Sequence, residues 1–578
     1  MKFKRILAAV TLMASMTMFA GCGQGAGTAD SGSTSGSTEK TDLASDGIVD
    51  YKATDMSANP AQAKNRKDTL VIGTEAPNGV FNYVYAPGVY DSNITEVMFA
   101  HLNDVNDKGE VVPALADLPE ISEDKLTYTY KIKQDANWSD GTPITSKDVL
   151  IAMKIMCDGT YDGQIDIVTG GITVKGSKEY QAGSASEISG VKIVDDKTIS
   201  ITLEEVSSSA EYDLGDLVPL QEAYYSKYYS QGNTEGIKET FTNPGPASAS
   251  YKFVSYKPGE EVVFEANDKS LFGAPKTPNL IFKVTTEDTR LSMLQSGDID
   301  FDRIVTVNQD TIDTVESLNF LSYKMFPECG YSFIALNHNK PVLKDKAVRQ
   351  ALMYGLDREK IINTVNGKYA QAINIPQARA SWAYSEPENK YEYDIEKAKK
   401  ILDDAGWKEG SDGIREKDGV RLAIHYTGTS SSKKTEAILA IAPECWKQLG
   451  VDFTSDIVDF AALLDKMKGD DWEMCSLGWS LVANPYDATI FKTNGPQNDG
   501  KYSNAKVDEL YDKIARELDR DKAKELYAQL YDEFNEDLPY LFLNQTEDLY
   551  VYNGRLKNVE FSPYVRYAHN LYKVSIEE

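Results

Sequence analysis

The 578-residue chain lacks the commonest sequence signatures of enzymes. It has only four histidines and contains no HExxH, GxSxG or glycine-rich phosphate-binding motif. These absences remove the usual signs of metalloproteases, serine hydrolases and nucleotide-binding enzymes, although other enzymes remain open. We therefore predict that the chain is not an enzyme and has no catalytic residue, no cofactor and no metal site.

Cysteine is scarce and unclustered. The chain has five cysteines and no CxxC pair, and those after Cys22 are Cys157, Cys329, Cys445 and Cys475. Spacing alone cannot assign disulfides between them, and buried free thiols are an equal alternative.

Positive charge is also in short supply. The 61 lysines and arginines face 89 acidic residues, which gives a net charge of -28. This excess of negative charge argues against binding to nucleic acid or directly to anionic lipid headgroups.

Long apolar runs are absent after Cys22, and the one run before it is short. Three basic side chains within the first five positions precede the apolar stretch 6–19, which is followed by Ala20, Gly21 and Cys22. The stretch is too short to span a bilayer stably and has the layout of an export signal. A cysteine after two small residues resembles a bacterial lipobox, although Phe19 stands where leucine is usual. We predict a lipoprotein signal peptide over 1–22 with a lipidated Cys22, which anchors an extracytoplasmic protein to the bacterial cell membrane; a simple secretory signal with an incidental cysteine is the alternative.

The segment 23–65 is rich in Gly, Ser, Thr, Ala and Asp and has few large apolar residues. Such a composition buries too little surface to offset the entropy of ordering, so we predict a flexible tether. The body that follows exceeds 500 residues, which is too many for one hydrophobic core, and at least two lobes are expected.

The body has mixed α/β patterning. Strand patterns cover 69–74, 126–133, 422–426 and 451–454, and a hairpin is expected over 191–203. Helices are expected after the N-caps Asp345 and Asp394 and over 435–449. The alternation of strands and helices in the second half predicts a parallel or mixed sheet with helices on its faces.

Seven sequence blocks in order carry a family resemblance. They lie at 112–116, 135–149, 294–300, 337–341, 347–352, 398–407 and 477–480, and the second contains Trp138-Ser-Asp-Gly-Thr-Pro143. This pattern resembles the extracellular solute-binding proteins of family 5, the oligopeptide, dipeptide and nickel receptors of ABC importers.

The resemblance implies an α/β, two-lobed periplasmic-binding-protein-like fold (type II) with an extra subdomain inserted in the first lobe. Lobe one would comprise 66–91, 236–327 and 540–578, the extra subdomain 92–235, and lobe two 328–539. The chain would cross between lobes near 327–330 and 540–544. Hinge closure would capture an oligopeptide, and the closed monomer would deliver it to a membrane permease.

Site residues are expected on the two inward-facing rims. Lobe one would contribute a loop after its first strand, where ligands of open α/β sheets tend to bind. Lobe two would contribute the backbone after the first crossing, for pairing with an extended peptide, and the loop after a later strand. The predicted ligand-binding residues are Asn78, Phe81, Tyr83, Glu328, Cys329, Gly330, Tyr331, Phe333, Arg379, Trp382, Trp479, Leu481, Asn484, Tyr486 and Asp487. For Trp479 we expect replacement by alanine to weaken ligand binding and leave stability nearly unchanged.

One family mark is missing. In the family's peptide receptors the loop after Trp479 holds an aspartate that binds the peptide's α-ammonium, but 481–484 reads Leu-Val-Ala-Asn. Either Asp487 or Glu328 replaces it, or the ligand has no free amine there. Three alternatives stay open: an oligosaccharide stacked on tryptophans, a metal chelate, or a surface sensor lipoprotein without a transport role.

Overall fold

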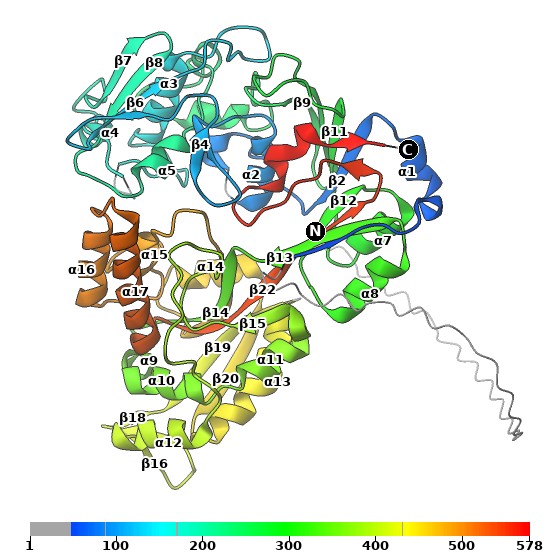
Figure 1. The fold of residues 1–578 in the computed structure, drawn as a ribbon. Helices are drawn as coiled ribbons and strands as arrows, with labels where there is room; N and C mark the ends of the chain where they lie inside the picture. The colour runs from blue at the N-terminus through cyan, green and yellow to red at the C-terminus, as the bar shows by residue number, and fades with distance from the viewer. Residues whose placement is uncertain (1–47, 87, 169–171, 431, 578) are drawn as a thin grey trace, which may run out of the picture. The chain divides into compact units, whose positions relative to one another are not determined.

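The structure is a computed structural model that describes residues 48–577 except 87, 169–171 and 431 (Figure 1). The predicted signal peptide, the lipidated Cys22 and the first part of the predicted tether lie outside the described residues. Within the described ranges, none of the helices combines the length and apolar character that crossing a membrane requires.

Residues 48–65 are ordered, so the prediction of a flexible tether is wrong for this part. Strand β1 (Val49–Tyr51) pairs antiparallel with β13 (Leu321–Pro327), and Tyr51 stacks on Tyr323 with ring centroids 4.9 Å apart. A short 3-10 helix, η1 (Met56–Ala58), and α1 (Ala61–Asn65) follow. Pairing with an existing strand supplies the contacts that the polar composition of the segment does not indicate.

The first group of strands contains β2 (Thr69–Thr74), β9 (Tyr251–Lys257), β10 (Glu261–Ala266), β11 (Asn279–Val284) and β12 (Phe301–Ile304). Strand β2 lies between β11 and β12 and runs parallel to both. Leu70 and Ile72 pack into one hydrophobic core, whereas Val71 packs into another on the opposite face with α7 (Arg290–Ser296) and α8 (Gln309–Ser317). Both faces of this strand are therefore buried, which explains its nearly continuous apolar sequence.

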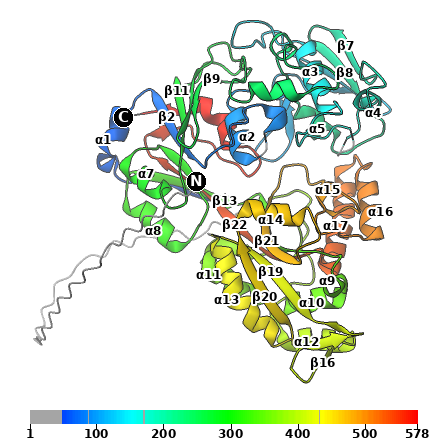
Figure 2. The same cartoon turned by 180° about the vertical axis from the view of Figure 1, so that it is seen from behind.

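The second group contains β14 (Gly330–Leu336), β15 (Ala370–Ala372), β19 (Ala423–Thr429), β20 (Asp452–Val458) and β21 (Met474–Ser480). Helices α10 (Lys346–Tyr354), α11 (Arg358–Val365), α12 (Ile395–Asp404) and α13 (Lys433–Lys447) belong to this half (Figure 2). The predicted N-caps are confirmed: Asp345 accepts from the backbone N–H of Ala347, and Asp394 from that of Lys397. Strand β19 runs parallel to its neighbours β20 and β21, as the predicted sheet requires.

One strand belongs to both groups. The first residues of β22 (Tyr540–Asn553) pair with β14, and its residues from Glu547 onward pair with β13. Figure 1 shows β22 running from β14 toward β12. Pairing with β14 ends at Asn544, and pairing with β13 begins at Glu547. The chain therefore crosses between the halves at 545–547, a few residues after the crossing expected at 540–544.

The segment 92–235 holds a separate four-stranded sheet with the order β5-β6-β8-β7. Its strands are β5 (Glu120–Ile121), β6 (Thr127–Lys131), β7 (Val191–Asp195) and β8 (Thr198–Thr202), and β7 and β8 form the predicted hairpin. Trp138 is buried, and its indole N–H donates to Asp148 over 3.3 Å. Asp148 also completes the capping box of α3 (Ser146–Met156) with Thr145. The block 135–149 is therefore scaffold.

The other elements are short or lie near the site. They are α2 (Val89–Glu96), β3 (Asn103–Val105), β4 (Val111–Pro113), α4 (Ser177–Gln181), α5 (Ala210–Gly215), α6 (Glu222–Tyr225), α9 (Pro341–Lys344), β16 (Lys408–Glu409), β17 (Arg415–Lys417), β18 (Val420–Arg421), α14 (Phe460–Met467), α15 (Ala488–Phe491), α16 (Ala505–Ile514), α17 (Arg520–Asp537), β23 (Leu556–Lys557) and β24 (Ser575–Ile576), with 3-10 helices η2 (Tyr83–Tyr85), η3 (Glu235–Thr240), η4 (Gly367–Tyr369) and η5 (Tyr567–Lys573).

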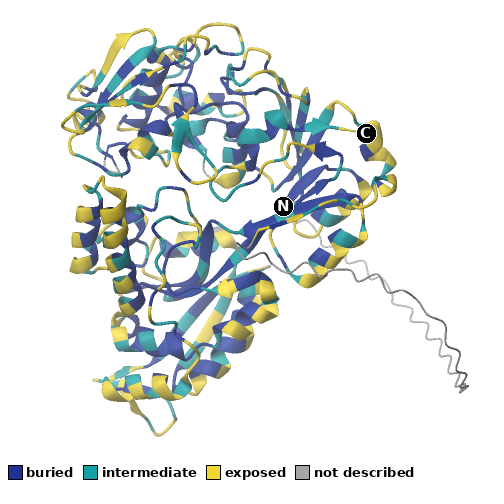
Figure 3. Cartoon of the chain, viewed as in Figure 1, coloured by how far each residue is buried: buried dark blue, intermediate teal, exposed yellow. Residues whose placement is uncertain are grey.

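Both halves contain buried residues (Figure 3). One core draws on residues 70–326 and 552–574, and another lies entirely within residues 331–543. Cys157, Cys329, Cys445 and Cys475 are buried free thiols, so they form no disulfide among the described residues. Two separately packed halves joined by few chain connections are the arrangement that permits hinge motion.

Candidate ligand-binding site

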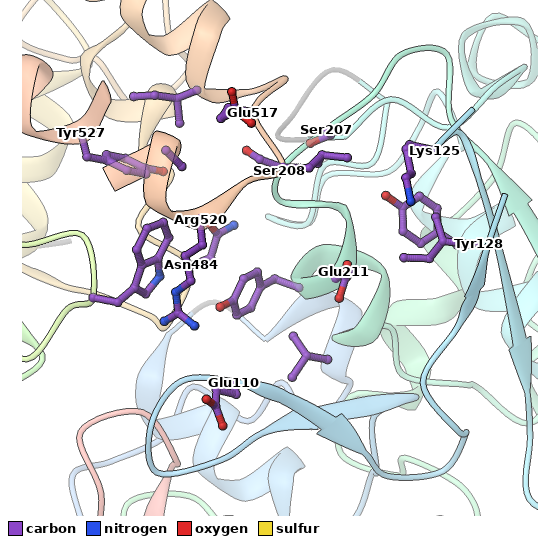
Figure 4. A pocket seen from close by; sticks show the side chains of 17 residues that line it. Glu110, Lys125, Tyr128, Ser207, Ser208, Glu211, Asn484, Glu517, Arg520 and Tyr527 are labelled. Atoms are coloured by element: carbon purple, nitrogen blue, oxygen red, sulfur yellow. The ribbon is translucent and has the colours of Figure 1, made fainter. Parts of the chain in front are cut away.

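Two adjoining cavities have walls drawn from both halves. The first has a volume of about 420 Å³ and lies between the 92–235 segment and α16 and α17 (Figure 4). The second, of about 300 Å³, lies between the 92–235 segment, the loop 482–486 and the C-terminal residues 564–569. Val111, Tyr212 and Asn484 line both cavities, which places the two side by side.

The first cavity has an aromatic wall. The Trp382 ring packs edge-on against Tyr527 with centroids 5.6 Å apart, and the Arg520 guanidinium lies 4.7 Å from the Trp382 ring centroid. The indole N–H of Trp382 has no hydrogen-bond partner among the described side chains and backbone. This wall offers an apolar surface and a cation, a combination that suits an amphipathic ligand.

The opposite wall of the first cavity is polar. Figure 4 shows Glu110, Lys125 and Glu211 across from Arg520, and Glu517 lies on the Arg520 side. Charges of both signs therefore face the space. Such a surface can accommodate polar groups of either sign along a chain-like ligand.

One wall of the second cavity is a chain of alternating carboxylates and imidazoles. His101 lies 3.0 Å from Asp216 and 3.4 Å from Glu96, and His569 lies 3.5 Å from Glu96 and 3.6 Å from Asp104. Although burial opposes charge, the neighbouring carboxylates raise the pKa of His101 well above its usual value. The pKa of Glu96 is held well below its usual range because burial is outweighed by His101 and His569. The wall is therefore an ion-pair network.

Part of that network has the spacing of a metal site. The ligand atoms of Glu96, Asp104 and His569 lie within 4.8 Å of one another. Each imidazole nitrogen of His569 already faces one of the two carboxylates. These groups satisfy one another as ion pairs, so the geometry does not require a metal.

The rest of the second cavity includes polar and apolar side chains from both halves. The Tyr83 hydroxyl donates to Asp216 over 2.9 Å, and the Ser209 hydroxyl donates to Asp213 over 2.8 Å. Burial raises the pKa of Asp213 to about 6, although Ser209 and Asn484 favour its ionised form. Asp213 thus comes from α5 and meets a residue of the loop 482–486.

Four of the predicted site residues line these cavities. They are Tyr83, Trp382, Asn484 and Tyr486. They come from both halves. Tyr83 and Tyr486 line the second cavity, Trp382 lines the first, and Asn484 lines both.

Three predicted aromatic residues lie in the cores instead. Phe81 is fully buried against Phe253 and Tyr256, and Tyr331 and Phe333 are buried in the second core. They lie in the predicted loop and strand, but their side chains point into the cores, where each packs against other aromatic rings. The prediction of ligand contact for these three side chains is therefore corrected to a packing role.

The backbone of 329–333 is already paired. The carbonyl of Cys329 accepts from the N–H of Leu481, and β14 pairs with β21 along its whole length. A side chain at Gly330 would bring its Cβ to 2.6 Å from the Trp479 carbonyl oxygen, so the glycine serves close strand packing rather than approach of a ligand. The predicted backbone pairing with a peptide at this segment is corrected accordingly.

The remaining predicted residues lie outside both cavities. Asn78 holds the buried Asp91, Glu328 pairs with Arg303 at 3.2 Å, and Arg379 bonds Gln371 and Ala372 beside a different cavity. Trp479 stacks on Phe333, and with Leu481 it packs against the second core. Asp487 is buried and accepts from the Tyr511 hydroxyl. The two acids expected to bind an amine, Glu328 and Asp487, therefore do not line either cavity.

Several cavity residues were not predicted from sequence. The most informative are Tyr212, Asp213, Arg520 and Tyr527. The helix-forming stretch 210–216 contains three acids, which is a visible but unspecific signal. Arg520 and Tyr527 lie on the polar and buried sides of one helix and carry no pattern that separates them from ordinary helix residues.

The protein has two packed halves that are joined by two strand connections and that together line the cavities. This arrangement is that of a solute-binding protein of the type II periplasmic kind. The chain belongs to the bacterial extracellular solute-binding proteins, family 5, whose model matches residues 110–501. It is 26% identical over 525 residues to the oligopeptide-binding protein AppA of Bacillus subtilis, covering 89% of this chain and 92% of that protein.

Solved structures agree on the fold. AppA of Bacillus subtilis in complex with a nonapeptide superposes with a TM-score of 0.76 at 26% identity, covering 89% of this chain and 99% of that chain. NikZ of Campylobacter jejuni in complex with Ni(L-His) has a TM-score of 0.76 at 24% identity, covering 88% and 99%. The second likeness concerns the fold alone.

Proposed function

We propose that this protein is the receptor of an ABC importer and that it captures an oligopeptide in the two adjoining cavities. The observation that carries the proposal is the shared wall: Val111, Tyr212 and Asn484 border both spaces, so an extended ligand could run from one to the other. The aromatic wall at Trp382 suits apolar side chains, and the surrounding charges suit a zwitterionic chain. The nonapeptide bound by AppA supports this ligand class.

The proposed motion is closure about the two strand connections. Lobe one would comprise 66–91, 236–327 and 540–578, with 92–235 as its extra subdomain, and lobe two 328–539. Strand β13 ends at Pro327, β14 begins at Gly330, and β22 changes partners at 545–547. A ligand that contacts both walls stabilises the closed form in proportion to its extra contacts there.

Binding without catalysis is part of the proposal. Glu96, His101 and His569 form ion pairs and Trp382 packs against Tyr527, an arrangement that suits recognition. The protein would act as a monomer, present the closed form to a membrane permease, and need no cofactor.

Native mass spectrometry of residues 48–578, purified from a peptide-rich medium, tests the ligand class. We expect a series of added masses that fragment into peptides. Added masses that resolve into sugars or a nickel chelate would contradict the peptide assignment. A protein that carries no ligand and binds no peptide library would contradict it as well.

We also propose that Cys22 carries the lipid that holds the protein at the extracytoplasmic face of the cell membrane. The support is the order of basic, apolar and small residues before this cysteine. Cys22→Ser should abolish metabolic labelling by a palmitate analogue and release the protein from the membrane fraction. Labelling that persists in the variant would contradict the assignment.

A further inference from the structure

Asp213 is a carboxylate with no cationic partner in the wall of the second cavity. It lies on α5, accepts a hydrogen bond from the Ser209 hydroxyl over 2.8 Å, and forms no ion pair with any lysine, arginine or histidine of the described chain. Burial is the main cause of its raised pKa, and the nearby Asp216 adds to it. An ionised carboxylate in such a place is stabilised by any cation that enters the cavity.

The neighbouring acids of the same cavity, unlike Asp213, have histidine partners. Glu96 has His101 and His569, Asp104 has His569, and Asp216 has His101 together with the Tyr83 hydroxyl. Their charges are already compensated within the protein. Asp213 alone among these four acids lacks such a partner in the described structure.

The position of Asp213 matters as much as its charge. The loop 481–484, Leu-Val-Ala-Asn, contains no acid, and its Asn484 lines the second cavity together with Asp213. The carboxylate of Asp213, from the first half, therefore lies beside the loop 481–484 of the second half, which has no carboxylate of its own. The cavity also offers the Tyr486 ring beside Asn484.

We propose that Asp213 binds a primary ammonium group of the peptide ligand, with Asn484 and Tyr486 completing the pocket. This inference rests on the proposed function, because it assumes that the ligand is a peptide. The ammonium would be the peptide's amino terminus or a lysine side chain, which share the same chemistry. Charge-assisted hydrogen bonds of this kind are the stronger ones in partly buried sites.

The proposal also assigns the ligand a direction. An ammonium held at Asp213 lies in the second cavity, and the chain would continue past Tyr212 and Asn484 into the first cavity, toward Trp382 and Arg520. The cationic Arg520 and the ring of Trp382 would then face later residues of the peptide.

The test uses residues 48–578 and synthetic nonapeptide libraries that exclude lysine, arginine and histidine, with free or acetylated amino termini. Affinities are measured by isothermal titration calorimetry and native mass spectrometry. For the unaltered protein we expect acetylation to weaken binding about tenfold or more. Asp213→Asn should weaken binding of the free-amine library by a similar factor and leave binding of the acetylated library unchanged.

Matched variants separate charge from fold. Asp117→Asn makes the same chemical change at an exposed position of the same segment that lines neither cavity, and it should leave both affinities unchanged. Asp213→Glu keeps the carboxylate and should retain the preference for a free amine. Equal thermal unfolding of Asp213→Asn and Asp117→Asn would show that the fold is intact.

A third library, acetylated and with one lysine per peptide, identifies the source of the ammonium. Binding restored by lysine in the unaltered protein, but not in Asp213→Asn, assigns the site to a side chain. The proposal is overturned if neither acetylation nor the added lysine changes the affinity of the unaltered protein, or if both change the affinity of Asp213→Asn by the same factor as that of the unaltered protein. If the unaltered protein binds none of the libraries, the peptide function itself fails, which is a distinguishable result.

Discussion

Asp213 and Asp487 are two carboxylates of similar kind in different surroundings. Burial raises the pKa of Asp213 to about 6 and that of Asp487 to about 7. Asp213 lies in a cavity wall, whereas Asp487 accepts from the Tyr511 hydroxyl over 2.5 Å and lines neither cavity. The comparison shows that a raised pKa alone does not identify a binding group; the direction in which the carboxyl faces decides.

Asp487 is surrounded by aromatic hydroxyls. The tyrosines that feel its charge are Tyr331, Tyr486, Tyr511, Tyr527, Tyr531 and Tyr540. Its second carboxylate oxygen has no hydrogen-bond partner among the described atoms. Without a cation or a ligand within reach, such a group avoids the cost of burial by keeping its proton.

The largest expected effect is on the free energy of unfolding, which the ionisation of buried Asp487 lowers at high pH. In the unfolded chain its carboxyl titrates near 3.8, and in the folded protein near 7. Between these values the folded protein keeps a proton that the unfolded chain has released, so stability falls as pH rises through this window. Asp487→Asn should remove this loss and raise the free energy of unfolding at pH 8 by up to about 4 kcal/mol.

Urea unfolding of the unaltered protein and Asp487→Asn at pH 5 and pH 8 checks this expectation. The gain from the substitution should fall to about 2 kcal/mol at pH 5, because only the interval from 3.8 to 5 contributes there. Peptide affinity should not change. A gain that is equal at both pH values, or a loss of affinity like that of Asp213→Asn, would erase the distinction between the two acids.

A smaller effect separates two tryptophans in the same way. Both side chains are partly buried and pack against the second core, Trp479 stacking on Phe333, but only Trp382 also lines the first cavity, beside Arg520. Trp479→Ala should therefore lower the free energy of unfolding by about 3 kcal/mol. Trp382→Ala should also lower stability and, unlike Trp479→Ala, should weaken binding of the free-amine nonapeptide library by about tenfold.

Thermal unfolding and calorimetric titration of both variants check this pair. Trp479 packs against the second core and lines neither cavity, so we expect its replacement to affect stability rather than binding. Weaker binding with unchanged unfolding in Trp479→Ala would contradict this and support a ligand contact.

Local signals in the sequence predicted much of the fold. The N-caps Asp345 and Asp394 and the hairpin at 191–203 depend on neighbours within a few residues, and the structure has them. The order of residues 48–65 was missed because it depends on β13, which lies more than 250 residues further along the chain. Such pairing leaves no trace in local composition.

The site was predicted less completely for the same reason. Tyr83, Trp382, Asn484 and Tyr486 follow from loop positions at strand ends and from the resemblance. Phe81 and Phe333 were misassigned because period and residue type do not reveal which side of a loop or strand another half will cover. Asp213 and Asn484 meet only through tertiary structure.

Strand β22 has a consequence for how this chain acquires its structure. It pairs with β12, β13, β14 and β15, so both groups of strands depend on residues 540–553. During synthesis neither sheet can be completed until nearly the whole polypeptide has emerged, and folding must wait for contacts between distant parts of the sequence. A chain that ends before Tyr540 would leave the edges of β12 and β14 open to pairing with other molecules, which predisposes such fragments to aggregate.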